Sequence, residues 1–202
     1  MDLISTIGLA MGSSWVSGIN LYAAVATLGL LNRFAHLQLP DQLSIVSNWW
    51  VIVVAIALYL IEFFADKIPY LDSAWDVAHT FIRVPAGAAL AAASFADYDK
   101  SVQVIALLLG GGIALSSHAT KATSRMAINT SPEPASNIAA SLFEDVVSVG
   151  SIFLAVFYPI VIIVIVVICV IIAFIILPKI LRFLRSVATK IRKFLATAES
   201  SD

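Results

Sequence analysis

Three basic side chains at helical spacing lie in the middle of an otherwise apolar chain. His118, Lys121 and Arg125 follow one another at intervals of three and four residues, among serine and threonine hydroxyls, and Glu144 and Asp145 enter the apolar segment that comes next. Residues at these intervals share one face of a helix. Lysine, arginine and hydroxyl groups on one face are typical of a site that binds a carboxylate, a phosphate or a lipid headgroup.

A second group of ionisable residues precedes this stretch. Asp72, Asp76, His79 and Arg83 stand at intervals of four, three and four residues, so they form one stripe of a predicted helix. A cation at membrane depth costs about 2.5 kcal/mol or more. We therefore expect Arg83 to have an acidic partner, and the candidates are Asp66, Asp76 and Glu144.

Two acids close the apolar segment before the stripe. Glu62 and Asp66 are one helical turn apart and share a face. Carboxylates placed in this way repel each other unless a cation or a proton joins them. Asp66, Lys67 and Asp72 are also close to predicted helix ends, so we expect them at the membrane interface.

The composition is that of an integral membrane protein. Of 202 residues, 60% are hydrophobic and 12% are charged, and the mean hydropathy is +0.97, whereas soluble domains have about 25% charged residues. The net charge of -1 argues against a nucleic-acid partner. Cys169 is the one cysteine, so no disulfide is expected, and the sequence predicts no cofactor and no metal site.

The hydrophobic pattern predicts an all-α, polytopic transmembrane helical bundle of about six spans, or five if Pro159 does not break the last apolar run. We expect a membrane domain at 1–178 and a basic amphipathic helix at 179–202 on an anionic leaflet. The positive-inside rule predicts a cytoplasmic C-terminus in the inner membrane, and six spans would put the N-terminus on the same side. The expected helices are 4–31, 48–65, 71–95, 101–127, 135–158 and the run after Pro159.

Small and polar residues fill the middle of the first apolar segment. Gly8 and Gly12 fit the close packing of membrane helices through small residues. Ser17-Gly18-Ile19-Asn20 has a second interpretation, a break that frees backbone groups to line a cavity, as in the discontinuous helices of transporters. The sequence leaves both interpretations open.

The two halves of the chain are loosely alike. Gly12 and Ser17 occupy the places of Gly112 and Ser117 at a shift of 100 residues, and each half later has a helix with acids near its start. Two such halves of three spans would be inverted relative to each other, which is the arrangement of many carriers.

Three long motifs connect the chain with a known family. They are SGINLYAAVATLGLLNRF, EFFADKIPYLDSAWDVAHTFIRVPAGAALAA and SSHATKATSRMAINTSPEPASNIAASLFEDV. From about Ile4 to Tyr158 the chain resembles the bacterial membrane proteins of domain-of-unknown-function family 4126, a resemblance that implies neither a substrate nor a site residue. The stretch Glu62-x-x-x-Asp66-Lys67 is similar to the acidic-Gly-Asp-Lys signature of small manganese and calcium exchangers, but it lacks the glycine and has another spacing.

These patterns predict a transporter of a small anionic solute or a lipid headgroup, coupled to protons. Membrane lipids and a second copy of the chain are the other expected partners. One alternative is a scaffold or assembly factor whose buried charges fix the helix register. Another is a lipid-modifying enzyme, for which His118 and nearby serines supply residue types but no recognised motif.

The residues expected to act in transport fall into two sets. The expected substrate-binding residues are Asn20, Arg83, His118, Lys121 and Arg125. The expected proton-coupling or counter-charge residues are Glu62, Asp66, Asp76, His79, Glu144 and Asp145.

Overall fold

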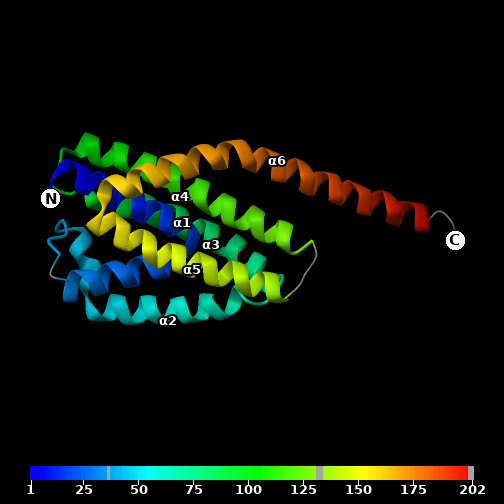
Figure 1. Ribbon diagram of the computed structural model, residues 1–202, viewed down its shortest axis with the longest axis horizontal. Helices are drawn as coiled ribbons and strands as arrows, with labels where there is room; N and C mark the ends of the chain where they lie inside the picture. Colours follow the sequence, from blue (N-terminus) through cyan, green and yellow to red (C-terminus); the bar gives the residue numbers. More distant parts are fainter. Residues whose placement is uncertain (36, 131–133, 200–202) are drawn as a thin grey trace.

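The computed structural model describes residues 1–35, 37–130 and 134–199, and it confirms the all-α class (Figure 1). In these residues the chain forms six α-helices and one short 3-10 helix. The elements are α1 (Leu3–Phe34), η1 (Leu43–Ser47), α2 (Trp49–Ala65), α3 (Leu71–Ser94), α4 (Lys100–Ile128), α5 (Pro134–Phe157) and α6 (Pro159–Glu199).

Polar caps and a proline set several helix ends. The Ser5 backbone N–H donates to Asp2 Oδ1 (2.8 Å) at the start of α1, and the Trp50 N–H donates to Asn48 Oδ1 (2.9 Å) at the start of α2. Pro159 is the first residue of α6, where its missing N–H costs nothing. The predicted break at Pro159 is therefore confirmed.

α1 is interrupted at Asn20, whose φ of -148° and ψ of 94° are not helical. The half before the break runs beside α4 in the same direction. Ser117 Oγ donates to the Trp15 carbonyl (2.7 Å), and one turn further along both helices Lys121 Nζ donates to the Ile19 carbonyl (3.1 Å).

The half of α1 after the break runs antiparallel to α2. Gly29, late in α1, lies against Ile52, early in α2, whereas Leu21, just after the break, lines the same groove as Leu58, late in α2. Because α2 and α4 point the same way in Figure 1, the two halves of α1 run in opposite directions. The helix therefore doubles back at Asn20.

Both ends of α1 lie at one end of the bundle. Asp2 and Leu39 line one pocket there, and Leu9 and Leu28 belong to one apolar core. α1 is thus a re-entrant hairpin with Asn20 at its tip. Non-helical backbone at membrane depth is tolerated where protein covers it, and 78% of the apolar window of α1 is buried, against 17% in α6.

Several helices are apolar enough for a multi-pass membrane protein. By length and composition, four described helices could cross a membrane: α1, α4, Ala135–Phe157 of α5 and Pro159–Arg182 of α6. α2 is also apolar but has 17 residues. α1 has the length of a span, yet its path returns to the side where it starts.

Close approach explains the small residues of α1. Gly8 lies against Pro159, and a Cβ on Gly18 would overlap Ser117 Oγ and the Ala114 carbonyl of α4. The close packing and the break at Asn20 are both confirmed, whereas the lining of a cavity by the freed backbone groups stays a prediction. α4 has no described break, so the two halves of the chain differ in shape and their relation stays a prediction.

α6 continues beyond the other helices in Figure 1. It is one helix through Pro178 to Glu199, so the chain does not turn at residue 179. The predicted amphipathic face of 179–202 involves many side chains outside the described part of the structure, and it stays a prediction.

Candidate functional site

Lys121 of α4 is the centre of a buried charge network. Its Nζ lies 2.7 Å from Asp66 Oδ2 and 3.5 Å from Glu144 Oε2. Glu62 Oε1 and Asp76 Oδ1 are each 3.6 Å away. Four carboxylates from three helices and one turn thus surround a single ammonium group.

Arg83 of α3 joins two of these carboxylates. Its NH2 lies 2.9 Å from Glu62 Oε1 and its NH1 lies 2.6 Å from Asp76 Oδ1, and all three side chains are buried. The prediction of an acidic partner for Arg83 is confirmed. Asp76 was among the expected partners, whereas Glu62 was not.

Arg125, one turn after Lys121, holds Glu144 through two parallel hydrogen bonds. Nε donates to Glu144 Oε1 (3.1 Å) and NH2 donates to Oε2 (2.7 Å). NH1 donates to the backbone carbonyls of Asp66 and Asn137, each at 3.1 Å. These carbonyls fix the guanidinium so that its other edge faces the carboxylate.

The tip of the α1 hairpin meets this network. Besides its acidic partners, Lys121 Nζ donates to the Ile19 carbonyl, which ends the first half-helix. His118 Nδ1 lies 3.3 Å from the Gly18 carbonyl. A positive group at a helix C-terminus is favourable, so the break and the lysine stabilise each other.

Asn20 caps the second half-helix. Its Oδ1 accepts the Ala23 backbone N–H (2.9 Å), which is the N-cap arrangement. Its Nδ2 lies 3.5 Å from Asp145 Oδ1. The residue therefore orders the tip and connects it to α5.

The two histidines have different surroundings. His118 Nε2 lies 2.7 Å from Thr80 Oγ1, and its Nδ1 lies 3.4 Å from Arg83 NH1, so it contacts the network directly. His79 instead contacts the Tyr22 hydroxyl (3.0 Å) and stacks on the Trp75 ring at 4.2 Å. The sequence predicted that both histidines belong to one site. In the structure His79 instead lies beside the second half of α1.

Several functional candidates were missed or misplaced by sequence reasoning. Asp66 and Asp72, expected at the interface, are 3% and 0% exposed. Asn129 Nδ2 donates to both oxygens of Asp72 (2.9 and 3.2 Å), and Asn137 Nδ2 donates to Asn129 Oδ1 (3.1 Å). Position near a helix end suggested solvent, but the packing of α3, α4 and α5 buries these groups.

The network has more acids than bases. Nine ion pairs among the described residues join five carboxylates to three cations. The carboxylates of Glu62, Asp66 and Asp76 each have one oxygen with no hydrogen-bond partner among the described residues. With all five carboxylates ionised, two negative charges would have no cation, and burial makes such charges costly unless protons or cations join them.

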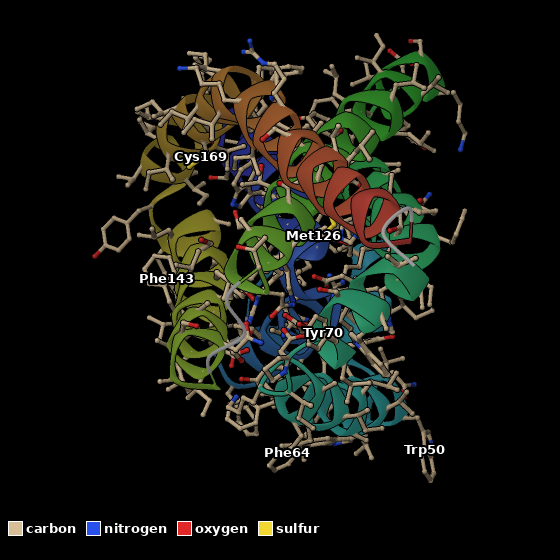
Figure 2. The ribbon with its side chains drawn as sticks, turned by 90° about the vertical axis from the view of Figure 1, so that its right-hand side faces the viewer. Trp50, Phe64, Tyr70, Met126, Phe143 and Cys169 are labelled. Atoms are coloured by element: carbon tan, nitrogen blue, oxygen red, sulfur yellow. The ribbon has the colours of Figure 1, made fainter. Side chains whose placement is uncertain are left out.

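The polar groups lie inside the bundle. Figure 2 shows oxygen and nitrogen atoms gathered between the helices, while Trp50, Phe64 and Phe143 lie at the periphery, each more than half exposed. Within the network the acid with the largest exposure is Glu144, whose side chain is 18% exposed.

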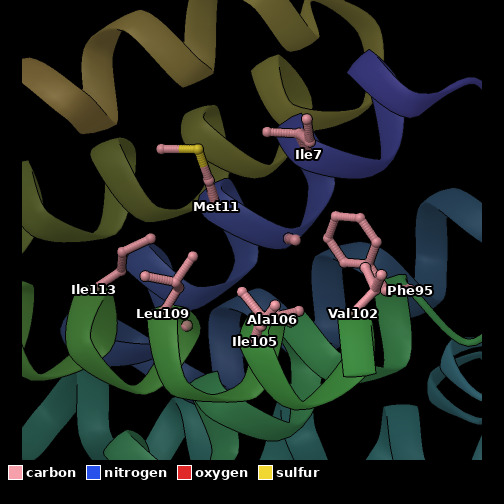
Figure 3. A pocket seen from close by; sticks show the side chains of 11 residues that line it. Ile7, Met11, Phe95, Val102, Ile105, Ala106, Leu109 and Ile113 are labelled. Atoms are coloured by element: carbon pink, nitrogen blue, oxygen red, sulfur yellow. The ribbon is translucent and has the colours of Figure 1, made fainter. Parts of the chain in front are cut away.

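An apolar cavity of about 380 Å³ lies elsewhere, between α1, α3 and α4 (Figure 3). Its wall includes Ile7, Met11, Phe95 and Ile113, with no charged side chain. The cavity is therefore separate from the charge network. Among the described residues no group of three or more His, Cys, Asp or Glu side chains is arranged to hold a metal ion.

The break at Asn20 and the charge network lie within the residues matched by one family model. A family model described as "Domain of unknown function (DUF4126)" matches residues 7–179. The chain belongs to this family. The DUF4126 match extends past Tyr158, where the resemblance of the motifs stops, so it includes the apolar part of α6. No curated protein and no solved structure matches the chain.

Proposed function

We propose that this protein is a proton-coupled membrane carrier of a small anionic solute or lipid headgroup, with the charge network at the α1 break as its transport site. One observation carries the proposal: the five carboxylates of the network outnumber its three cations by two around the ends of an interrupted helix. Interrupted helices and buried ionisable residues are the parts from which carriers build their binding sites.

The charge balance supports coupling of the anion to protons. The three cations are already paired with carboxylates. An entering anion would raise the uncompensated negative charge further, which is unfavourable in a region of low dielectric constant. Protons that neutralise carboxylates remove this penalty and release a cation for the anion. Anion and protons therefore move together.

The path of α1 leads to a five-span topology. With α1 re-entrant, α2 to α6 cross the membrane, and the N-terminus lies on the opposite side from the C-terminus. The C-terminus is cytoplasmic in this proposal, in the inner membrane, with a membrane domain at 1–178 and a basic tail at 179–202.

Cysteine labelling in whole cells tests this topology. In a Cys169→Ala background, we expect Asp2→Cys and Asp99→Cys to react with a membrane-impermeant maleimide from outside, and Thr130→Cys to react after permeabilisation. A six-span chain would put residues 2 and 99 on opposite sides. Protection of Asp2→Cys together with labelling of Asp99→Cys would contradict the re-entrant α1.

Proteoliposomes with trapped pyranine test the coupling. With the membrane potential clamped by potassium and valinomycin, an inward gradient of succinate, glutamate or phosphate is expected to acidify the lumen. Lys121→Ala should remove this acidification, because four carboxylates lose their common cation. Arg33→Ala, an exposed arginine outside the network, should retain it.

A scaffold is the second candidate, because every cation of the network forms an ion pair with a carboxylate, as required of charges that fix helix register. If the protein is a scaffold, the lumen pH of vesicles that contain it should equal that of empty vesicles with each of the three anions. That outcome would overturn the carrier of small anionic solutes in favour of the scaffold.

A further inference from the structure

We infer that the carboxylate of Glu144 occupies the cargo-binding subsite when no cargo is bound. The subsite is the Nε and NH2 edge of Arg125, and it binds an oxyanion, which is either a carboxylate or a phosphate group. The inference rests on the proposed function, because it identifies where the anionic group of the cargo binds.

Arg125 is built as an oxyanion receptor. Its NH1 is held by the carbonyls of Asp66 and Asn137, and its side chain is fully buried. The Nε and NH2 edge is therefore presented in a fixed direction. A guanidinium edge of this kind matches two oxygens of a carboxylate or a phosphate.

A second cation converges on the same oxygen. Glu144 Oε2 lies 2.7 Å from Arg125 NH2 and 3.5 Å from Lys121 Nζ. The contacts described for the Glu144 side chain run to these two cations. Displacing this carboxylate frees the Nε and NH2 edge of Arg125 and breaks no other described hydrogen bond. Asp66 Oδ2 stays 2.7 Å from Lys121 Nζ and 3.8 Å from Arg125 NH2, so Arg125 provides the main contact for an entering oxyanion.

Glu144 is also the most exposed acid of the network. Its side chain is 18% exposed, whereas those of Glu62, Asp72 and Asp76 are 0–1% exposed. Protonation of Glu144 weakens its hold on Arg125, and the carboxyl can then give way to a free oxyanion. The proton and the oxyanion thus enter at the same place, which accounts for the coupling.

Chemical rescue of Glu144→Ala tests this subsite in the purified full-length protein in detergent. The variant should unfold at a lower temperature than wild type, and acetate should restore it in a saturable way. At a hundredfold excess over half-saturation the rise in Tm should be about 5 °C or more. Chloride at the same ionic strength is the blank.

Parallel titrations with acetate, inorganic phosphate and dihexanoyl phosphatidylglycerol distinguish the source of the group. A response to acetate indicates a carboxylate solute, a response to phosphate alone indicates a phosphorylated solute, and a response to the phosphatidylglycerol alone indicates a lipid headgroup. Each supports the oxyanion subsite. No response beyond chloride to any of the three would overturn it.

Two matched variants control for non-specific stabilisation. Glu62→Ala, which removes a sealed carboxylate, should not be rescued, and Glu144→Ala with Arg125→Gln should lose the rescue. Equal rescue of Glu62→Ala and Glu144→Ala would overturn the inference. If Glu144→Ala folds only when it is purified in acetate, that dependence is itself the rescue. If Glu144→Ala does not fold even in acetate while Glu144→Gln folds, the result would contradict the subsite.

The vesicle assay separates this inference from the proposed function. Rescue by acetate or phosphate without anion-driven acidification would retain the subsite and overturn the carrier. Acidification without rescue would retain the carrier and place the oxyanion elsewhere.

Discussion

Arg83→Gln is expected to destabilise the protein by about 3–5 kcal/mol, because it leaves the buried carboxylates of Glu62 and Asp76 without their principal cation. Unfolding by sodium dodecyl sulfate in bicelles, followed by tryptophan fluorescence, measures the change in free energy. Arg33→Gln is the matched control. Arg33 is exposed and stands over the Trp49 ring at 4.4 Å, so its loss should cost less than about 1 kcal/mol.

A double variant shows that the cost comes from stranded charge. Adding Glu62→Gln to Arg83→Gln removes one of the two uncompensated carboxylates, so part of the lost stability should return. Additive losses from the two substitutions would instead show that packing of the arginine side chain, and not charge pairing, sets the effect.

Gly18→Ala is the second large effect that we expect. The new Cβ would overlap Ser117 Oγ and the Ala114 carbonyl, so α1 and α4 would have to separate at the hairpin tip. Overpacking of a core costs about 1–3 kcal/mol and sometimes more. We expect the upper end of this range, since a backbone atom is involved, together with loss of anion-driven acidification in the vesicle assay.

Gly112→Ala provides the control for Gly18→Ala. It places the same methyl group on a helical glycine that has nothing within 4 Å of the added Cβ. Helix propensity alone should then act, and it favours alanine by about 1 kcal/mol or less. A similar loss of stability in both variants would mean that the α1–α4 crossing is not as close as described.

Local patterns carried enough information for most helices. Apolar runs bounded by Pro69, Pro134 and Pro159 gave helix ends within one or two residues of those observed. The intervals between Asp76, His79 and Arg83 gave their common stripe. The break near Asn20 was also foreseen as one of two interpretations, because small polar residues are unusual in the middle of an apolar segment.

The direction of the chain after the break could not be foreseen. Composition is the same for a segment that crosses a membrane and for one that turns back inside protein, so residues 4–31 looked like a span. The two directions differ only in tertiary contacts, such as Leu21 beside the groove of Leu58 and Ile19 against Lys121.

Partners across helices were beyond reach for the same reason. Glu62 and Arg83 are on different helices, and no spacing rule relates them. Asp72 looked interfacial because it begins a helix, yet Asn129 arrives from α4 and closes over it. The chemical types at the site were readable, whereas their pairing required the fold.

The contacts of α1 also fix the order in which the protein can be assembled. α1 is synthesised first, but its first half packs on α4, α5 and α6, which leave the ribosome last. The hydroxyls of Ser14 and Ser17 lack the carbonyls to which they donate until α3 is made, and the Ile19 carbonyl lacks Lys121 until α4 is made. The first segment made therefore completes its contacts only after the last helices have been made.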